Sequence, residues 1–73
     1  MKDIREMAYE FVCGKFENLN DLKSAMDFSD NLKKLSPKEV SEQAGNTFYD
    51  EGRFWREVMN AVNYTLWYKF YQF

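Results

Sequence analysis

The sequence contains no histidine, and Cys13 is its single cysteine. One cysteine cannot form a disulfide within the chain, and without histidine it cannot build a Cys/His zinc site. Sparse cysteine is typical of a reducing compartment, which predicts a cytoplasmic location. Histidine is also the usual general base near neutral pH, so its absence predicts a protein that is not an enzyme.

Long apolar runs are missing as well. The N-terminal residues MKDIREMAYEF alternate charged with apolar side chains. A signal peptide needs a continuous apolar block, and a membrane-spanning helix needs about 20 consecutive apolar residues. The sequence therefore predicts neither a signal peptide nor any association with a membrane.

Neither sign of charge dominates. Ten Lys and Arg against twelve Asp and Glu give a formal net charge of −2. A nucleic-acid-binding domain is usually strongly basic, and a protein that mimics DNA is strongly acidic. We therefore expect no direct binding of nucleic acid.

What is present is a short chain rich in aromatic residues. Its 73 residues are 45% hydrophobic and 19% aromatic, which is typical of a globular protein rather than a disordered one. This length is near the lower limit for a fold held by its core alone. We expect a single helical domain over residues 1–73, stabilised by aromatic bulk or by a partner.

The first helix is predicted from apolar residues at three-four spacing, which share one helical face: Ile4, Met7, Ala8, Phe11 and Val12. Glycine readily adopts the left-handed conformation that ends many helices, so Gly14 is the predicted end. The alternative is a helix that continues through Gly14 to Phe16.

The second helix is predicted to begin at Asn20 and Asp21, because a capping side chain and a negative first turn suit the positive end of a helix dipole. Its apolar stripe is broad enough to contact two neighbours. The stripe consists of Leu22, Ala25, Met26, Ser29 and Leu32, widened by Phe28 and Leu35.

The segment Ser36-Pro-Lys-Glu39 predicts a capping box: Ser36 caps the helix, Pro37 occupies its first position, and Glu39 bonds back to the Ser36 backbone. It ends the second helix at Leu35 and begins the third. The third helix has a thin apolar face, interrupted by Gly45 and Asn46, so it is expected to be short or bent. That face is formed by Val40, Ala44, Thr47 and Phe48.

A long fourth helix is predicted after a break at residues 50–52. One face repeats at helical spacing to the end of the chain: Trp55, Val58, Met59, Val62, Leu66, Phe70 and Phe73. The opposite face carries Tyr64, Trp67, Tyr68 and Tyr71. The predicted fold is all-α, a compact bundle of three or four helices with a long, aromatic-rich C-terminal helix.

The second aromatic face allows two interpretations. A helix that is apolar on all sides is normally buried, which would place the fourth helix in the middle of the bundle. Tyrosine hydroxyls, however, need a polar partner or water, and Tyr and Trp are favoured at interfaces for that reason. The face would then be a dimer contact or a binding surface.

Catalytic and metal chemistry finds little support. The acidic pairs Asp50–Glu51 and Asp27–Asp30 could act as acid and base or bind a divalent ion, but carboxylates at helix ends usually cap or solubilise. Neither pair has the spacing of a calcium-binding loop. Cys13 has no histidine to activate it and is expected to be a packing residue. We predict no cofactor and no metal.

Residues 36–55 resemble the helix-turn-helix of small DNA-binding regulators. Val40, Ala44 and Gly45 are small or apolar where that motif requires it. Asn46 and Glu51 are polar where it requires buried residues. The segment that would enter DNA, residues 48–53, carries two acids and a glycine, so a regulator is only the alternative prediction.

The sequence therefore predicts a non-catalytic protein-binding module. In profile it resembles small phage and mobile-element proteins that inhibit a host enzyme or defence complex, including anti-CRISPR and antirestriction proteins. The resemblance implies steric occlusion of a protein target. We expect aromatic anchors at Tyr64, Trp67, Tyr68 and Tyr71, and acidic residues that meet a basic patch at Asp27, Asp30, Asp50 and Glu51. A homodimer or structural homo-oligomer is the remaining alternative.

Overall fold

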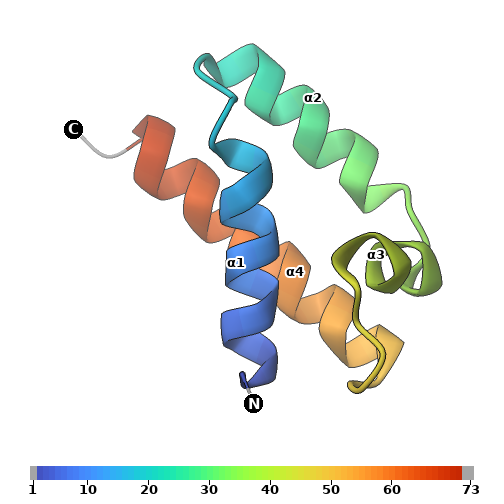
Figure 1. The fold of residues 1–73 in the computed structure, drawn as a ribbon. Coiled ribbons are helices and arrows are strands. Elements are labelled where there is room, and N and C mark those ends of the chain that lie inside the picture. The colour runs from blue at the N-terminus through green and yellow to red at the C-terminus, as the bar shows by residue number, and fades with distance from the viewer. Residues whose placement is uncertain (1, 72–73) are drawn as a thin grey trace.

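The computed structural model describes residues 2–71, and within them the chain forms four α-helices, a terminal π-helical turn and no strand (Figure 1). The elements are α1 (Ile4–Phe16), α2 (Leu22–Lys33), α3 (Pro37–Ala44), α4 (Glu51–Leu66) and the π-helical turn η1 (Trp67–Tyr71). The predicted all-α bundle with a long, aromatic-rich C-terminal helix is confirmed.

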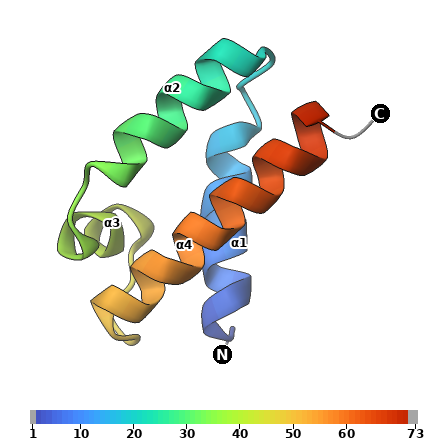
Figure 2. The ribbon, with the colours of Figure 1, turned by 180° about the vertical axis from the view of Figure 1, so that it is seen from behind.

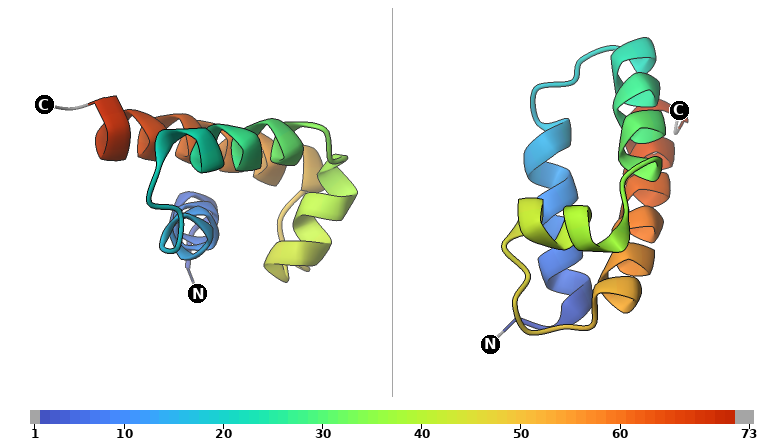
Figure 3. Two further views of the ribbon diagram at one scale, coloured as in Figure 1. Left: turned by 90° about the horizontal axis from the view of Figure 1, so that it is seen from above. Right: turned by 90° about the vertical axis from the view of Figure 1, so that its right-hand side faces the viewer.

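Helix α4 is the centre of the bundle and contacts α1, α2 and α3. Helices α2 and α4 lie side by side in one layer, α1 crosses the face of that layer, and α3 closes one end (Figure 3). Both α2 and α3 lie on the same side of the crossing between α1 and α4, as the views from front and back show (Figures 1 and 2). The C-terminal half of α4 emerges on the other side.

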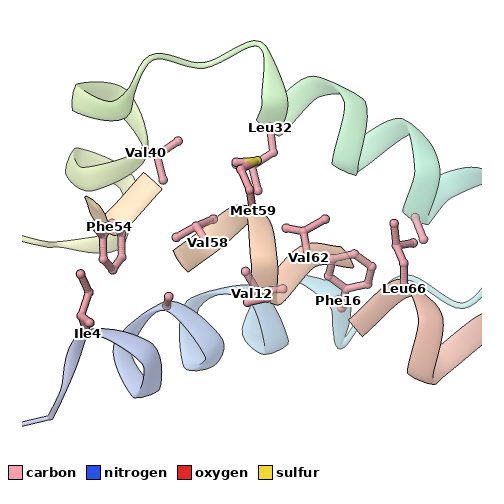
Figure 4. Packing of buried hydrophobic residues seen from close by; sticks show 13 residues of the cluster. Ile4, Val12, Phe16, Leu32, Val40, Phe54, Val58, Met59, Val62 and Leu66 are labelled. Carbon is pink, nitrogen blue, oxygen red and sulfur yellow. The ribbon is translucent and has the colours of Figure 1, made fainter. Parts of the chain in front are cut away.

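The hydrophobic core lies where α1, α2 and α3 meet α4. In Figure 4 the α4 side chains lie between α1 on one side and Leu32 and Val40 on the other. Because α4 supplies almost half of the buried apolar residues, its first predicted face is the main packing surface. The buried apolar residues are Ile4, Ala8, Val12, Phe16, Ala25, Leu32, Val40, Phe54, Val58, Met59, Ala61, Val62 and Leu66.

Helix α1 continues through Gly14 to Phe16, so the predicted end at Gly14 is wrong and the longer alternative is correct. The backbone N–H of Glu17 still donates to the Cys13 carbonyl at 3.0 Å. Phe16 is buried and its ring meets the edge of Phe28 from α2, at 5.4 Å between centroids. Burying this large ring favours a helix that continues past Gly14 over one that ends there.

Helix α2 is shorter than predicted at both ends. Its N-cap is Asp21 rather than Asn20, because the Asp21 carboxylate accepts from both the backbone N–H and the hydroxyl of Ser24. It ends at Lys33, and the Leu35 carbonyl instead accepts from the indole N–H of Trp55 at 3.2 Å. This bond ties the end of α2 to α4.

The predicted capping box at the start of α3 is present. The Glu39 backbone N–H donates to Ser36 Oγ at 3.2 Å, and the Ser36 N–H donates to the Glu39 carboxylate at 3.1 Å. Helix α3 ends at Ala44 because Gly45 adopts a left-handed conformation with φ of 72°. Thr47 and Phe48 therefore lie beyond the helix and are exposed, and their predicted place on its apolar face is wrong.

In the described part of the chain, no helix has the length and apolar character that crossing a membrane requires.

Candidate protein-binding surface

Four large aromatic side chains on α1, α4 and η1 are exposed to solvent, and we call them the aromatic surface: Tyr9, Tyr64, Trp67 and Tyr68. Their exposed fractions are 46%, 54%, 55% and 60%. Single exposed apolar residues are common on proteins, but adjacent exposed aromatic rings mark interaction sites.

Ring contacts join three of these residues across α1, α4 and η1. Tyr9 of α1 meets Tyr64 of α4 edge to face, with 6.3 Å between ring centroids. Tyr64 stacks on Tyr68, one helical turn further, at 6.0 Å and an interplanar angle of 18°. Aromatic pairs at such distances are attractive, so the rings hold one another in place before any partner binds.

A hydrogen bond with Cys13 raises the pKa of the Tyr9 hydroxyl, and the neighbouring Tyr64 and Tyr68 raise it further. Tyr9 therefore stays neutral and keeps its hydroxyl proton at physiological pH. A neutral phenol can donate or accept a hydrogen bond at an interface.

The local sequence explains why these rings face solvent. Val62 and Leu66, one turn apart, point into the core and are buried. Successive residues on an α-helix are rotated by about 100°, so Tyr64 and Tyr68 share a different face. Their exposure, with that of Trp67, excludes the interpretation in which the fourth helix is enclosed on all sides at these positions. The side chain of Tyr71, the remaining predicted anchor, lies outside the described residues.

Two hollows, lined by residues of α1, α4 and η1 with Glu17, adjoin the aromatic surface, and we call them together the α1–α4 groove. One has a volume of about 400 Å³ and is lined by Arg5, Glu6, Tyr9, Glu57, Asn60, Ala61 and Tyr64. The other has a volume of about 670 Å³ and is lined by Tyr9, Cys13, Phe16, Glu17, Thr65, Tyr68 and Lys69. Tyr9 lines both, so the two hollows are neighbours on the surface.

Lys69 fixes the far end of the groove. Its ammonium group donates to the Phe16 carbonyl at the C-terminal end of α1, at 2.8 Å. The same carbonyl also accepts from the Leu19 backbone N–H at 3.0 Å. A cation at this position is favoured by the negative end of the helix dipole. The bond holds η1 against α1 and so positions Tyr68 beside the groove.

The structure does not bring the four predicted acidic residues to the aromatic surface. Asp50 and Glu51 are at the N-terminal end of α4, about 20 Å along the helix from Tyr64 at 1.5 Å per residue. The Asp50 carboxylate caps α4 by accepting from the Arg53 N–H at 2.9 Å. Asp27 and Asp30 are exposed on α2, where Asp27 forms an ion pair with Lys23 at 3.3 Å.

The segment that resembles a helix-turn-helix consists of α3, a six-residue connection and α4. Asn46 in this connection is buried, as that motif requires, although its side chain is polar. Its amide compensates by donating to Ser41 Oγ and to the Tyr49 carbonyl and by accepting from the Tyr49 N–H. Glu51 is exposed in the first turn of α4, the part of such a helix that would approach DNA.

The residues of this site that sequence reasoning missed include Tyr9, Glu6, Glu17 and Glu57. Tyr9 was visible as an aromatic residue outside the apolar stripe of the first helix. A helical pattern shows which face a residue occupies, but not which other helix lies beside that face. The contact between Tyr9 and Tyr64 therefore becomes visible only in the assembled bundle.

Among residues 2–71, no three Asp, Glu, Cys or His side chains gather in a group that could hold a metal ion. No known protein family, curated protein or solved structure matches the chain.

Proposed function

We propose that this protein is a non-catalytic protein-binding module that inhibits a host enzyme or defence complex by steric occlusion, in the manner of small phage and mobile-element inhibitors. The aromatic surface is the observation that carries the proposal: Tyr9, Tyr64, Trp67 and Tyr68 are each about half exposed on a folded helical frame. The lone cysteine fits action in the cytoplasm.

Aromatic side chains of this kind supply much of the binding energy in protein interfaces. Tyr and Trp are enriched among the residues whose truncation costs most, and they cluster where water is excluded on binding. Rigid rings also lose little conformational entropy when a partner binds. The Tyr9–Tyr64 and Tyr64–Tyr68 contacts add to this by fixing the rings in advance.

The size of the molecule suits occlusion. Its accessible surface is 5087 Å². A standard protein interface takes about 800 Å² from each partner, which is about one sixth of that surface. The protein can therefore commit a large share of its surface to one target and still leave its other faces to cover neighbouring sites.

The acidic residues outside the aromatic surface have a secondary role in this proposal. Asp27 and Asp30 on α2, with Glu51 on α4, are exposed and can attract a basic target over a distance. They would raise the rate of association more than the affinity. Asp50 contributes less, because its carboxylate is engaged in capping α4.

The test is a pull-down of tagged protein from a lysate of the host, compared between wild type and Trp67→Gln/Tyr68→Gln. We expect wild type to retain one host protein in stoichiometric amount and to inhibit it after purification. The double variant should lose both binding and inhibition while keeping its helical circular dichroism. Glu42→Gln, an exposed change on α3, is the matched control and should behave as wild type.

Retention of the same protein by the double variant would contradict the proposal. So would binding without any effect on the activity of the bound protein.

A further inference from the structure

We infer that the target of this surface presents a basic amphipathic segment, which lies in the α1–α4 groove with its Lys or Arg side chains against Tyr rings and carboxylates. This inference rests on the proposed protein-binding function and specifies the chemistry of the partner.

The dimensions of the groove favour a single segment. Each hollow is lined by seven residues, and the two share Tyr9. A stable interface between two folded proteins uses about 20–30 residues on each side, so the groove alone is too small for one. A groove between two helices is the usual site for an amphipathic helix, whose apolar anchors enter hollows about one turn apart.

The charges of the groove favour a basic occupant. Glu6 from α1 and Glu57 from α4 line one hollow, and Glu17 lines the other. Among the described residues, none of these three carboxylates forms an ion pair or a side-chain hydrogen bond. A cation from a partner could therefore pair with each of them without breaking an existing contact.

The cations near the groove do not cancel this charge. The Lys69 ammonium donates to the Phe16 carbonyl. The Lys2 ammonium is paired with Glu10, and Glu10 raises the pKa of Lys2 more than Glu6 does. Among the described residues that line the two hollows, Arg5 is then the one remaining cation against three carboxylates. Glu17 adds to the negative end of the α1 dipole, since it is the C-cap of that helix.

The tyrosine rings complete the recognition of a cation. A Lys or Arg side chain can lie over the face of a Tyr ring, where the negative π-electron density attracts it. Tyr64 and Tyr68 each expose more than half of their surface beside the groove. A leucine or valine of the same segment could then enter the hollow beside Ala61, while its basic neighbours reach Glu57 and Glu6.

A second copy of this chain is the less suitable occupant. In a two-fold dimer the same patch meets itself, so the unpaired Glu6, Glu57 and Glu17 of one copy would approach those of the other. Like charges brought together at an interface are unfavourable, and one Arg5 from each copy cannot neutralise three carboxylates.

The probe is a synthetic amphipathic helix of Leu and Lys, compared with the same helix carrying Glu in place of Lys. Fluorescence anisotropy of each labelled peptide measures binding to the full chain. We expect the Lys peptide to bind at least about tenfold more tightly than the Glu peptide, with an affinity that falls as salt rises.

Charge reversal in the groove locates that binding. Glu57→Lys should weaken the affinity for the Lys peptide at least about tenfold. Glu42→Lys makes the same change in net charge on α3 and should change that affinity by less than about threefold. Circular dichroism checks that both variants fold. Equal losses in the two variants, or equal binding of the two peptides, would overturn the inference.

Two further outcomes distinguish the possible failures. If light scattering shows a concentration-dependent dimer that Trp67→Gln/Tyr68→Gln abolishes, the occupant is a second copy and the inference is wrong. If that double variant no longer binds the natural target but Glu57→Lys still binds it, the protein-binding proposal stands and the inference of a basic segment is wrong.

Discussion

Each of the four helices begins with a residue whose side-chain oxygen accepts a hydrogen bond from the backbone three residues later. These residues are Asp3, Asp21, Ser36 and Asp50. A cap of this kind contributes about 1 kcal/mol, and a domain of this size has roughly 5 kcal/mol in total. Capping is therefore a substantial part of what stabilises the helices at the scale of single residues.

The capping box of α3 gives a direct test at this scale. Ser36→Ala should lower the free energy of unfolding by about 0.5–2 kcal/mol, because the Glu39 N–H loses its acceptor. Urea unfolding followed by circular dichroism measures the change. Lys38→Ala, in the same helical turn and exposed, is the control and should stay within about 0.5 kcal/mol of wild type. Equal losses in the two variants would contradict a specific capping role.

A second residue-scale prediction concerns acid. The hydrogen bonds from the backbone N–H and the hydroxyl of Ser24 hold the pKa of Asp21 below its ordinary value of 3.8. A carboxyl whose pKa is lower in the folded state stabilises the fold above the unfolded-state pKa. That contribution is lost as the pH falls from about 3.8 through the folded-state pKa.

Asp21→Asn keeps a capping oxygen that does not titrate. The melting temperature of this variant should therefore fall less than that of wild type as the pH is lowered from about 5 to below 3.8. Asp30→Asn, which lies away from any cap, is the control and should show the same pH dependence as wild type. Parallel curves for wild type and Asp21→Asn would show that this cap does not depend on charge.

At the scale of the element, Lys69 links η1 to the end of α1. Lys69→Met keeps most of the aliphatic chain but removes the donor to the Phe16 carbonyl, so the free energy of unfolding should fall by about 1 kcal/mol. Hydrogen exchange should quicken for amides in the last turn of α1. Lys33→Met is the control, since it lies in the last turn of α2. Unchanged exchange in the last turn of α1 would mean that this bond does not hold the two elements together.

The helices themselves were predictable because each has local signals. The Ser36 cap, the Pro37 start and the apolar spacing of α4 act within a few residues, and the structure has all three. The end of α1 was not predictable from its glycine, because the competing term is the burial of Phe16 against Phe28 from α2. Local rules cannot weigh a contact made by another helix.

At the scale of the whole molecule, one part of the site was predictable from a single helix and another part was not, because it depends on how two helices pack. The exposed rings of Tyr64, Trp67 and Tyr68 follow from the opposite faces of one helix, which the sequence displays. Tyr9 and Glu6 join them only because α1 crosses α4 with α2 and α3 on the other side (Figure 1), whereas Glu57 lies on α4 itself, about two turns before Tyr64. The groove is thus a property of the assembled bundle.

The distribution of charge over the molecule predicts how it behaves toward DNA. Asp50 and Glu51 lie at the N-terminal end of α4 and the net charge is −2, so phosphate groups should be repelled. We expect no sequence-specific binding of duplex DNA in a gel-shift assay at physiological salt. A sharp shift that resists competitor DNA would instead favour the helix-turn-helix regulator.

The central claim is that α4 has one face for folding and another for binding. The most direct measurement compares the urea unfolding of Leu66→Ala with that of Trp67→Gln/Tyr68→Gln, because these neighbours are 8%, 55% and 60% exposed. Leu66→Ala should lose about 2–5 kcal/mol by leaving a cavity in the core. The double variant should lose only about 1 kcal/mol, from the Tyr64–Tyr68 stack. A double variant that unfolds as readily as Leu66→Ala would show that the aromatic surface serves the fold, and would contradict its assignment as a binding surface.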